Sequence, residues 1–143
     1  MATIEFYSEE ERIDEELLRG RIEKILTLVG HPKAALTCAF VSKEHIRDLN
    51  MSYRGLDEAT DILSFGGGED FPSQEDHFLG DLVISLESMR ENCQFFKVSE
   101  DEELTRLLVH GILHLLDWDH ATNEDEEPMI KRQEEIVKSI LKE

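Results

Sequence analysis

The sequence predicts an α+β protein with a mixed sheet of about four strands covered by helices. Short alternating or apolar runs, which are typical of strands, occur among longer stretches whose apolar residues recur every three or four positions, as in helices. The expected order is strand, helix, strand, helix, two strands and three helices, which favours one sheet with helices packed on it. A length of 143 residues suits one compact domain, so we expect a single domain over 1–143.

The first half of the chain supplies two strands and two helices. Residues 2–7 alternate as a strand, and apolar residues between 13 and 26 then recur at helical spacing. Residues 34–41 form an apolar run of strand length, and a helix is expected over 43–53. Candidate N-caps for the two helices are Ser8, in a capping box with Glu11, and Ser42.

The second half supplies two strands and three helices. Strands are expected over 62–65 and 79–84, and helices over 85–97, from 99 to about 116, and over 126–141. The residues expected to precede or cap these helices are Ser85, Ser99 in a capping box with Glu102, and Asn123.

Charge and composition exclude several classes of protein. The net charge of −18 argues against non-specific binding to nucleic acid or to an anionic membrane. No apolar run approaches the roughly 20 residues that span a bilayer, and no signal peptide is recognisable. Cys38 and Cys93 form no CxxC motif, so they are expected to be reduced thiols. A cytoplasmic protein without a membrane partner is therefore expected.

Three histidines close to one another are the most informative feature of the sequence. His110 and His114 would lie about 40° apart on one helical face, one turn from each other. On a continued helix His120 would lie about 15 Å from His110, too far to share an ion. The chain must therefore turn back after about Leu116, and Asp117 suits the turn because aspartate tolerates the left-handed region.

This spacing predicts a metal site, although a core or surface helix with a loop histidine would also explain it. Three imidazoles leave one tetrahedral position for water, as in catalytic zinc sites, and they favour zinc over magnesium. The spacing matches the zincin motif HExxHxxGxxH, so we expect a zincin-like domain with a histidine-bearing central helix. Gly111 replaces the general-base glutamate of that motif, and Asp117 replaces its glycine. Peptide hydrolysis by the usual route would therefore lack a proton acceptor.

The sequence resembles the bacterial YbeY endoribonucleases, which are rRNA maturation factors. Four segments carry the resemblance, and they are Asn50-x-x-Tyr53-Arg54, Thr60-Asp61-Ile62-Leu63-Ser64-Phe65, Gly80-Asp81-Leu82-Val83-Ile84-Ser85 and His110-Gly111-x-Leu113-His114-Leu115-x-x-x-Asp119-His120. The chain departs from the family pattern where Asp117-Trp118 replaces Gly-Tyr, and where Ala59 and Gly66 replace prolines.

The resemblance implies a zinc-dependent endoribonuclease of single-stranded type, active in rRNA maturation and small-subunit quality control. It implies one Zn²⁺ ion held by His110, His114 and His120, and a functional arginine at Arg54. The implied partners are ribosomal RNA and the small ribosomal subunit, and DNA is not expected. Two alternatives are a zincin-like metal hydrolase with a non-RNA substrate, such as a peptide, and a non-catalytic ribosome assembly factor.

Further residues have both a chemical and a structural interpretation. Arg54 suits phosphate oxygens because a guanidinium pairs with them bidentately, but it could also be a surface cation at a helix end. Carboxylates that could orient a ligand imidazole, or cap a turn instead, are Asp61, Asp81 and Asp119.

Two expectations concern the surface. Core packing is expected for the aromatic residues Phe95, Phe96 and Trp118. Lys43, Arg47 and Arg54 lie on or just after the second helix, which predicts a small cationic patch in an anionic body. RNA binding by such a protein would be weak and local, and would need a ribosome or protein partner.

Overall fold

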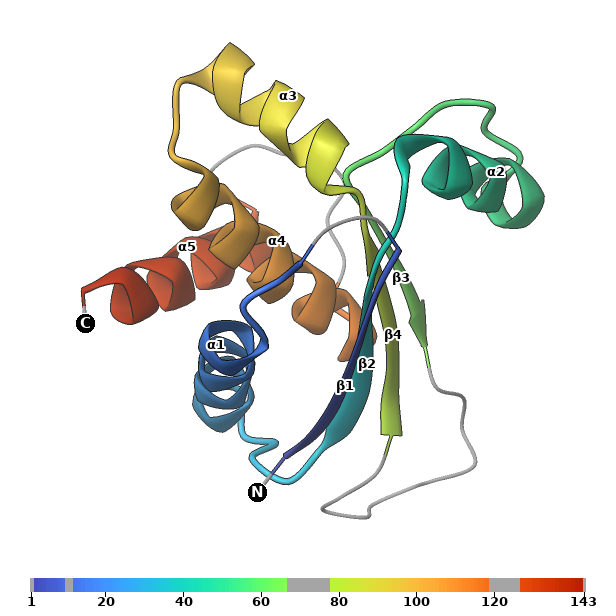
Figure 1. Ribbon diagram of the computed structural model, residues 1–143. Coiled ribbons are helices and arrows are strands. Elements are labelled where there is room, and N and C mark those ends of the chain that lie inside the picture. The colour runs from blue at the N-terminus through green and yellow to red at the C-terminus, as the bar shows by residue number, and fades with distance from the viewer. Residues whose placement is uncertain (1, 10–11, 67–77, 119–126, 143) are drawn as a thin grey trace.

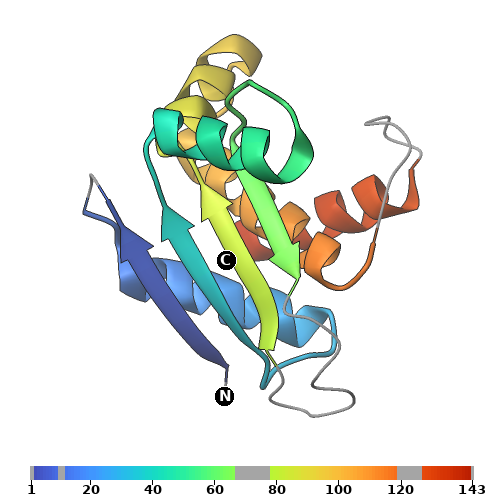
Figure 2. The same cartoon turned by 90° about the vertical axis from the view of Figure 1, so that its right-hand side faces the viewer.

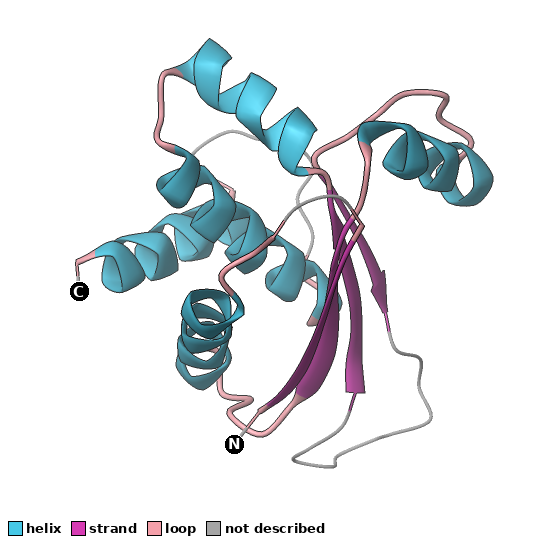
Figure 3. Cartoon of the chain, viewed as in Figure 1, coloured by secondary structure: helices cyan, strands magenta, loops and turns pink. Residues whose placement is uncertain are grey.

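The computed structural model describes residues 2–9, 12–66, 78–118 and 127–142. In chain order the elements are β1 (Thr3–Ser8), α1 (Glu15–Leu28), β2 (Ala35–Phe40), α2 (Lys43–Arg54), β3 (Ile62–Gly66), β4 (Phe78–Ile84), α3 (Leu86–Phe96), α4 (Glu100–Leu115) and α5 (Pro128–Leu141). Figures 1 and 3 show these elements arranged as helices packed on a twisted sheet. The α+β prediction is confirmed. No helix that the structure describes is long and apolar enough to cross a membrane.

The four strands form one mixed sheet in the order β1-β2-β4-β3. β1, β2 and β4 run parallel, and β3 pairs antiparallel with β4 at the edge, as Figure 2 shows. The parallel strands are joined through helices on the sheet faces, as such connections require. The predicted mixed sheet of about four strands is therefore confirmed.

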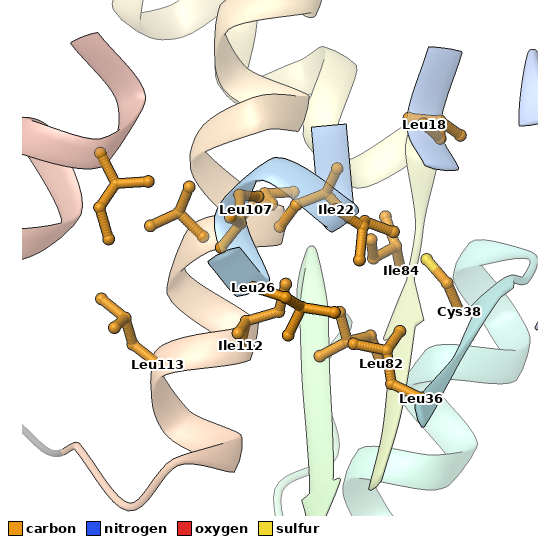
Figure 4. Packing of buried hydrophobic residues seen from close by; sticks show 14 of the residues in the cluster. Leu18, Ile22, Leu26, Leu36, Cys38, Leu82, Ile84, Leu107, Ile112 and Leu113 are labelled. Atoms are coloured by element: carbon orange, nitrogen blue, oxygen red, sulfur yellow. The ribbon is translucent and has the colours of Figure 1, made fainter. Parts of the chain in front are cut away.

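The main core lies between the sheet and the helices α1 and α4, with α5 packed against both helices (Figure 1). Leu82 and Ile84 of β4 meet Ile22 of α1 and Ile112 of α4, as Figure 4 shows, and all four are fully buried. On the opposite face of the sheet α2 covers a smaller cluster that consists of Ile46, Leu63 and Val83. α4 thus lies between the sheet and α5, which confirms the expected central helix.

Three of the predicted N-caps are confirmed. The side chains of Ser42, Ser85 and Ser99 each accept a hydrogen bond from the backbone N–H three residues further along. These bonds satisfy donors that the first turn of a helix otherwise leaves without a partner. The positions of α2, α3 and α4 therefore follow from local sequence.

The prediction that Ser8 caps the first helix is wrong. Ser8 is the last residue of β1, where it pairs with Phe40 of β2. α1 begins at Glu15, and Asp14 is its cap because its Oδ1 accepts a hydrogen bond from the N–H of Leu17 at 3.1 Å. Glu11 lies outside the described residues.

The last helix begins at Pro128, in the first-turn position where a missing N–H costs nothing. Its expected apolar face is confirmed, because Ile130, Ile136, Val137 and Ile140 are all buried. Asn123, the expected preceding residue, lies outside the described part of the chain.

The expectation of core packing is wrong for all three aromatic residues. The side chains of Phe95 and Phe96 at the end of α3 are 79% and 66% exposed, and they contact each other edge to face. Trp118 is 38% exposed. Cys38 and Cys93 are buried and free, as expected, and burial raises the pKa of the Cys38 thiol to about 12, so it is unreactive.

Candidate functional site

A broad cleft of about 1660 Å³ lies along β3, α4 and α5, and residues of α2 and α3 also line it. Both histidines of α4 line this cleft, together with Arg54 from the end of α2, Asp61 from before β3 and Gln133 from α5. The fold therefore brings together polar side chains that are up to 79 positions apart in the sequence, from Arg54 to Gln133.

His110 and His114 face each other one turn apart, as the sequence predicts. Their rings are 4.6 Å apart between centroids and nearly perpendicular, and their Nε2 atoms are 3.1 Å apart. Two nitrogens each about 2.0–2.1 Å from a tetrahedral zinc ion lie about 3.3–3.4 Å apart. The two Nε2 atoms are thus close to the separation that zinc ligands need, so the pair fits such an ion.

The third expected ligand, His120, and the candidate carboxylate Asp119 lie outside the described residues. The turn that leads toward them is described. Asp117 adopts the left-handed conformation with φ 69°, and its N–H donates to the carbonyl of His114 at 3.0 Å. The predicted turn at Asp117 is therefore confirmed, and the path of the chain beyond Trp118 lies outside the described residues. Among the residues that the structure describes, no three His, Cys, Asp or Glu side chains converge as a metal site.

Gln133 supports His110 from the neighbouring helix. The Oε1 atom of Gln133 lies 2.6 Å from Nδ1 of His110, and only 5% of the Gln133 residue is exposed. Histidine ligands in metal sites usually donate the N–H of the second ring nitrogen to such an acceptor. Gln133 was not predicted as a site residue, although its place on the apolar face of the last helix marks it as a buried polar residue.

A group of charged residues continues from Gln133 along the cleft. The Nε2 atom of Gln133 donates to Oε2 of Glu134 at 3.0 Å, and Glu134 accepts two further hydrogen bonds from Arg106. Arg106 also pairs with Glu102 and Glu103 at 3.0 Å. Burial alone would raise the pKa of Glu134, but the hydrogen bonds from Arg106 and Gln133 outweigh it and lower the pKa. The carboxylate of Glu134 is therefore ionised at neutral pH.

The two described candidate carboxylates have different positions. Asp61 lines the cleft, and its Oδ2 accepts a hydrogen bond from Asn92 of α3 at 2.9 Å, whereas no bond to a histidine is found among the described residues. Asp81 lies between Leu82 and Gly80 on β4, both of which face α4, so its side chain points to the opposite face. There it accepts a hydrogen bond from Thr37. The structure does not bring Asp81 together with His110 and His114.

The predicted cationic patch is wrong, because ion pairs neutralise two of its members. Lys43 pairs with Glu91 at 2.6 Å, and Arg47 pairs with Asp57 at 2.8 Å. Arg54 is exposed at the edge of the cleft and makes no ion pair with any residue in the described part of the chain. Of the three cations, Arg54 is therefore the one available to an anion in the cleft.

Gly111 lies where α4 touches the sheet. A Cβ atom at this position would lie 2.7 Å from Cδ2 of Leu82 and 2.8 Å from Cδ1 of Ile62. Leu82 is fully buried, so it has little room to move aside. A glutamate at this position, as in the metalloprotease motif, would therefore have to displace the side chains of Leu82 and Ile62.

These features define an α+β protein of zincin-like fold, with a histidine-bearing central helix beside a wide cleft. The sequence model described as "Endoribonuclease YbeY" matches residues 3–141. The Endoribonuclease YbeY of Bacillus mycoides (strain KBAB4) is 38% identical to this chain over an alignment of 148 residues, gaps included. The alignment covers 96% of this chain and 95% of that protein. The Treponema denticola protein of the same name is 39% identical over 128 residues, covering 87% and 83% respectively.

Structural comparison agrees with the sequence comparison. The solution structure of TM1509 from Thermotoga maritima superposes with a TM-score of 0.66 at 28% identity, covering 98% of this chain and 90% of that one. The chain belongs to the YbeY endoribonuclease family.

Proposed function

We propose that this protein is a zinc-dependent endoribonuclease that cleaves single-stranded RNA in rRNA maturation and small-subunit quality control. Its partners would be ribosomal RNA and the small ribosomal subunit, in the cytoplasm, and the catalytic domain would span 1–143. Membership of the YbeY endoribonuclease family supports the RNA substrate. The zinc dependence rests on one observation, the 3.1 Å separation of the Nε2 atoms of His110 and His114.

In this proposal His110, His114 and His120 hold the ion. Zinc bound to three imidazoles supplies a Lewis acid for a phosphate oxygen and lowers the pKa of a water molecule. Gln133 keeps the ring of His110 oriented through its contact with Nδ1. Arg54 binds the scissile phosphate and stabilises the charge that develops on its non-bridging oxygens.

A peptide substrate is disfavoured by the position of Gly111. The general-base glutamate of the metalloprotease motif would collide there with Leu82 and Ile62. Without that carboxylate the usual route of peptide hydrolysis has no proton acceptor. A purely structural role in ribosome assembly would explain neither the separation of the two imidazoles nor a buried glutamine aimed at one of them.

Zinc content and RNA cleavage by the purified protein test the proposal together. We expect about one zinc ion per chain by elemental analysis, and cleavage of a single-stranded RNA probe that a chelator abolishes and added zinc restores. A chelated protein that cleaves as fast as the untreated protein would contradict the zinc dependence. Zinc-loaded protein without any RNA cleavage would favour the assembly-factor alternative.

Replacing Arg54 with alanine should lower kcat/KM for RNA cleavage by about 10²–10³-fold, the usual effect of removing one group that stabilises transition-state charge. The kcat/KM of Arg54→Lys should lie between those of the wild type and Arg54→Ala, because lysine keeps the charge but loses the bidentate geometry. The matched control is Arg47→Ala, which removes a cation of the same helix that is already paired with Asp57. Equal losses in the Arg54 and Arg47 variants would mean that bulk charge alone matters.

A further inference from the structure

We infer that Glu134 and Arg106 are positioning residues that fix the tautomer of His110 through Gln133. The hydrogen bonds that join these residues leave the Nε2 atom of His110 without a proton and directed toward His114. The role of this lone pair in binding zinc rests on the proposed function, but the tautomer itself does not.

The network of hydrogen bonds begins at Arg106, which can only donate hydrogen bonds. Its Nε and Nη2 atoms donate to the two carboxylate oxygens of Glu134 at 2.9 and 3.0 Å. Glu102 and Glu103 hold the same guanidinium from the helix α4 itself. Arg106 is therefore fixed by three carboxylates, and it fixes Glu134 in turn.

The next step is the amide of Gln133. An ionised carboxylate only accepts, so Gln133 must turn its NH₂ group toward Glu134, where Nε2 donates to Oε2 at 3.0 Å. The amide oxygen consequently points the other way, to Nδ1 of His110 at 2.6 Å. A flipped amide would place its oxygen against the carboxylate, and this repulsion between acceptors is costly in a residue that is 5% exposed.

The last step is the imidazole. An amide oxygen only accepts, so Nδ1 of His110 must carry the proton. In a neutral imidazole the other nitrogen then has the lone pair. The contact between the two rings is compatible with this assignment, because the two Nε2 atoms are 3.1 Å apart and the lone pair on Nε2 of His110 can accept from an N–H on Nε2 of His114. Without a metal the two imidazoles can hydrogen-bond to each other. When a metal binds, the lone pair on Nε2 of His110 is already in place.

The decisive variant is Glu134→Gln, which keeps the shape and a hydrogen bond to Arg106. Its new amide can donate to Gln133, so the Gln133 amide is free to flip and offer its NH₂ group to His110. The matched control is Glu135→Gln, which neutralises the next carboxylate, an exposed one that pairs with Arg132 at 3.8 Å. Gln133→Met is a second variant that removes the acceptor while keeping a side chain of similar length and volume.

Imidazole ¹⁵N chemical shifts in metal-free protein, at a pH where both rings are neutral, report the tautomer directly. We expect His110 protonated on Nδ1 in the wild type and in Glu135→Gln, and a mixture or the Nε2-protonated form in Glu134→Gln and Gln133→Met. Zinc affinity, measured by chelator competition, should fall about 10–100-fold in the latter two variants and stay unchanged in Glu135→Gln.

Two results would overturn the inference. One is a wild-type His110 protonated on Nε2, and the other is a tautomer and zinc affinity in Glu134→Gln equal to those of the wild type. A wild type that binds no zinc would refute the proposed function instead. The ¹⁵N shifts of the metal-free proteins would still decide the tautomer, so the two failures are distinguishable.

Discussion

Replacing His114 with alanine is expected to abolish zinc binding and RNA cleavage while leaving the fold intact. The variant removes one of the two Nε2 atoms that face each other at 3.1 Å. Loss of a ligand should weaken zinc binding beyond the roughly 100-fold that loss of a supporting hydrogen bond costs. Cleavage should fall by more than the about 10²–10³-fold expected for Arg54→Ala. His114 is only partly buried, so we expect little loss of stability.

The control for this experiment is His45→Ala. His45 lies on α2 and pairs with Glu9 at 2.5 Å, outside the residues that line the cleft. Elemental analysis and RNA cleavage should match the wild type in this variant. If His114→Ala retained a full complement of zinc, the ion would have to be held elsewhere and the proposed site would be wrong.

Gly80→Ala should be the most destabilising of the substitutions considered. Gly80 has φ 144°, in the region that only glycine adopts readily, and it opposes Gly66 where β4 pairs with β3. A Cβ atom there would overlap the backbone oxygen of Phe65 and lie 2.9 Å from Cδ2 of Leu115. Backbone strain and overpacking together should cost about 4 kcal/mol of unfolding free energy, which lowers Tm by more than about 10 °C.

Gly20→Ala is the matched control, and its expected effect has the opposite sign. Gly20 lies within α1, and a Cβ atom there would meet no other atom within 4 Å. Alanine in a helix interior should stabilise the protein by about 0.5–1 kcal/mol. Thermal unfolding followed by circular dichroism measures both variants. A Gly80→Ala protein with the wild-type Tm would show that the strands can part at this position without cost.

Local patterns predicted most of the fold, and the failures came from long-range contacts. Ser42, Ser85 and Ser99 were recognisable as caps because capping needs only a residue and the N–H three positions on. Ser8 has the same local chemistry, but pairing with Phe40 of β2 extends β1 through it. Such pairing depends on a strand some thirty residues away, which local sequence does not reveal.

The site was predictable where it lies on one helix. The spacing of His110 and His114 was enough to place both rings on one face of α4, and Asp117 indeed makes the turn. The alternation along β4 also carried a usable signal, because Asp81 precedes the apolar Leu82 and so should face away from the core. The partnership of Gln133 with His110 joins two helices, and only their packing reveals it.

The place of Gln133 on α5 has a consequence for how the protein folds. α5 is synthesised after α4, so the support of His110 is missing until residues 128–141 dock on α4. A ligand that prefers the completed cleft stabilises this docking by mass action, by about 2.7 kcal/mol when its concentration is 100 times its dissociation constant. Ligand binding in the cleft and docking of α5 are therefore linked, so a bound ligand protects α5 from local unfolding.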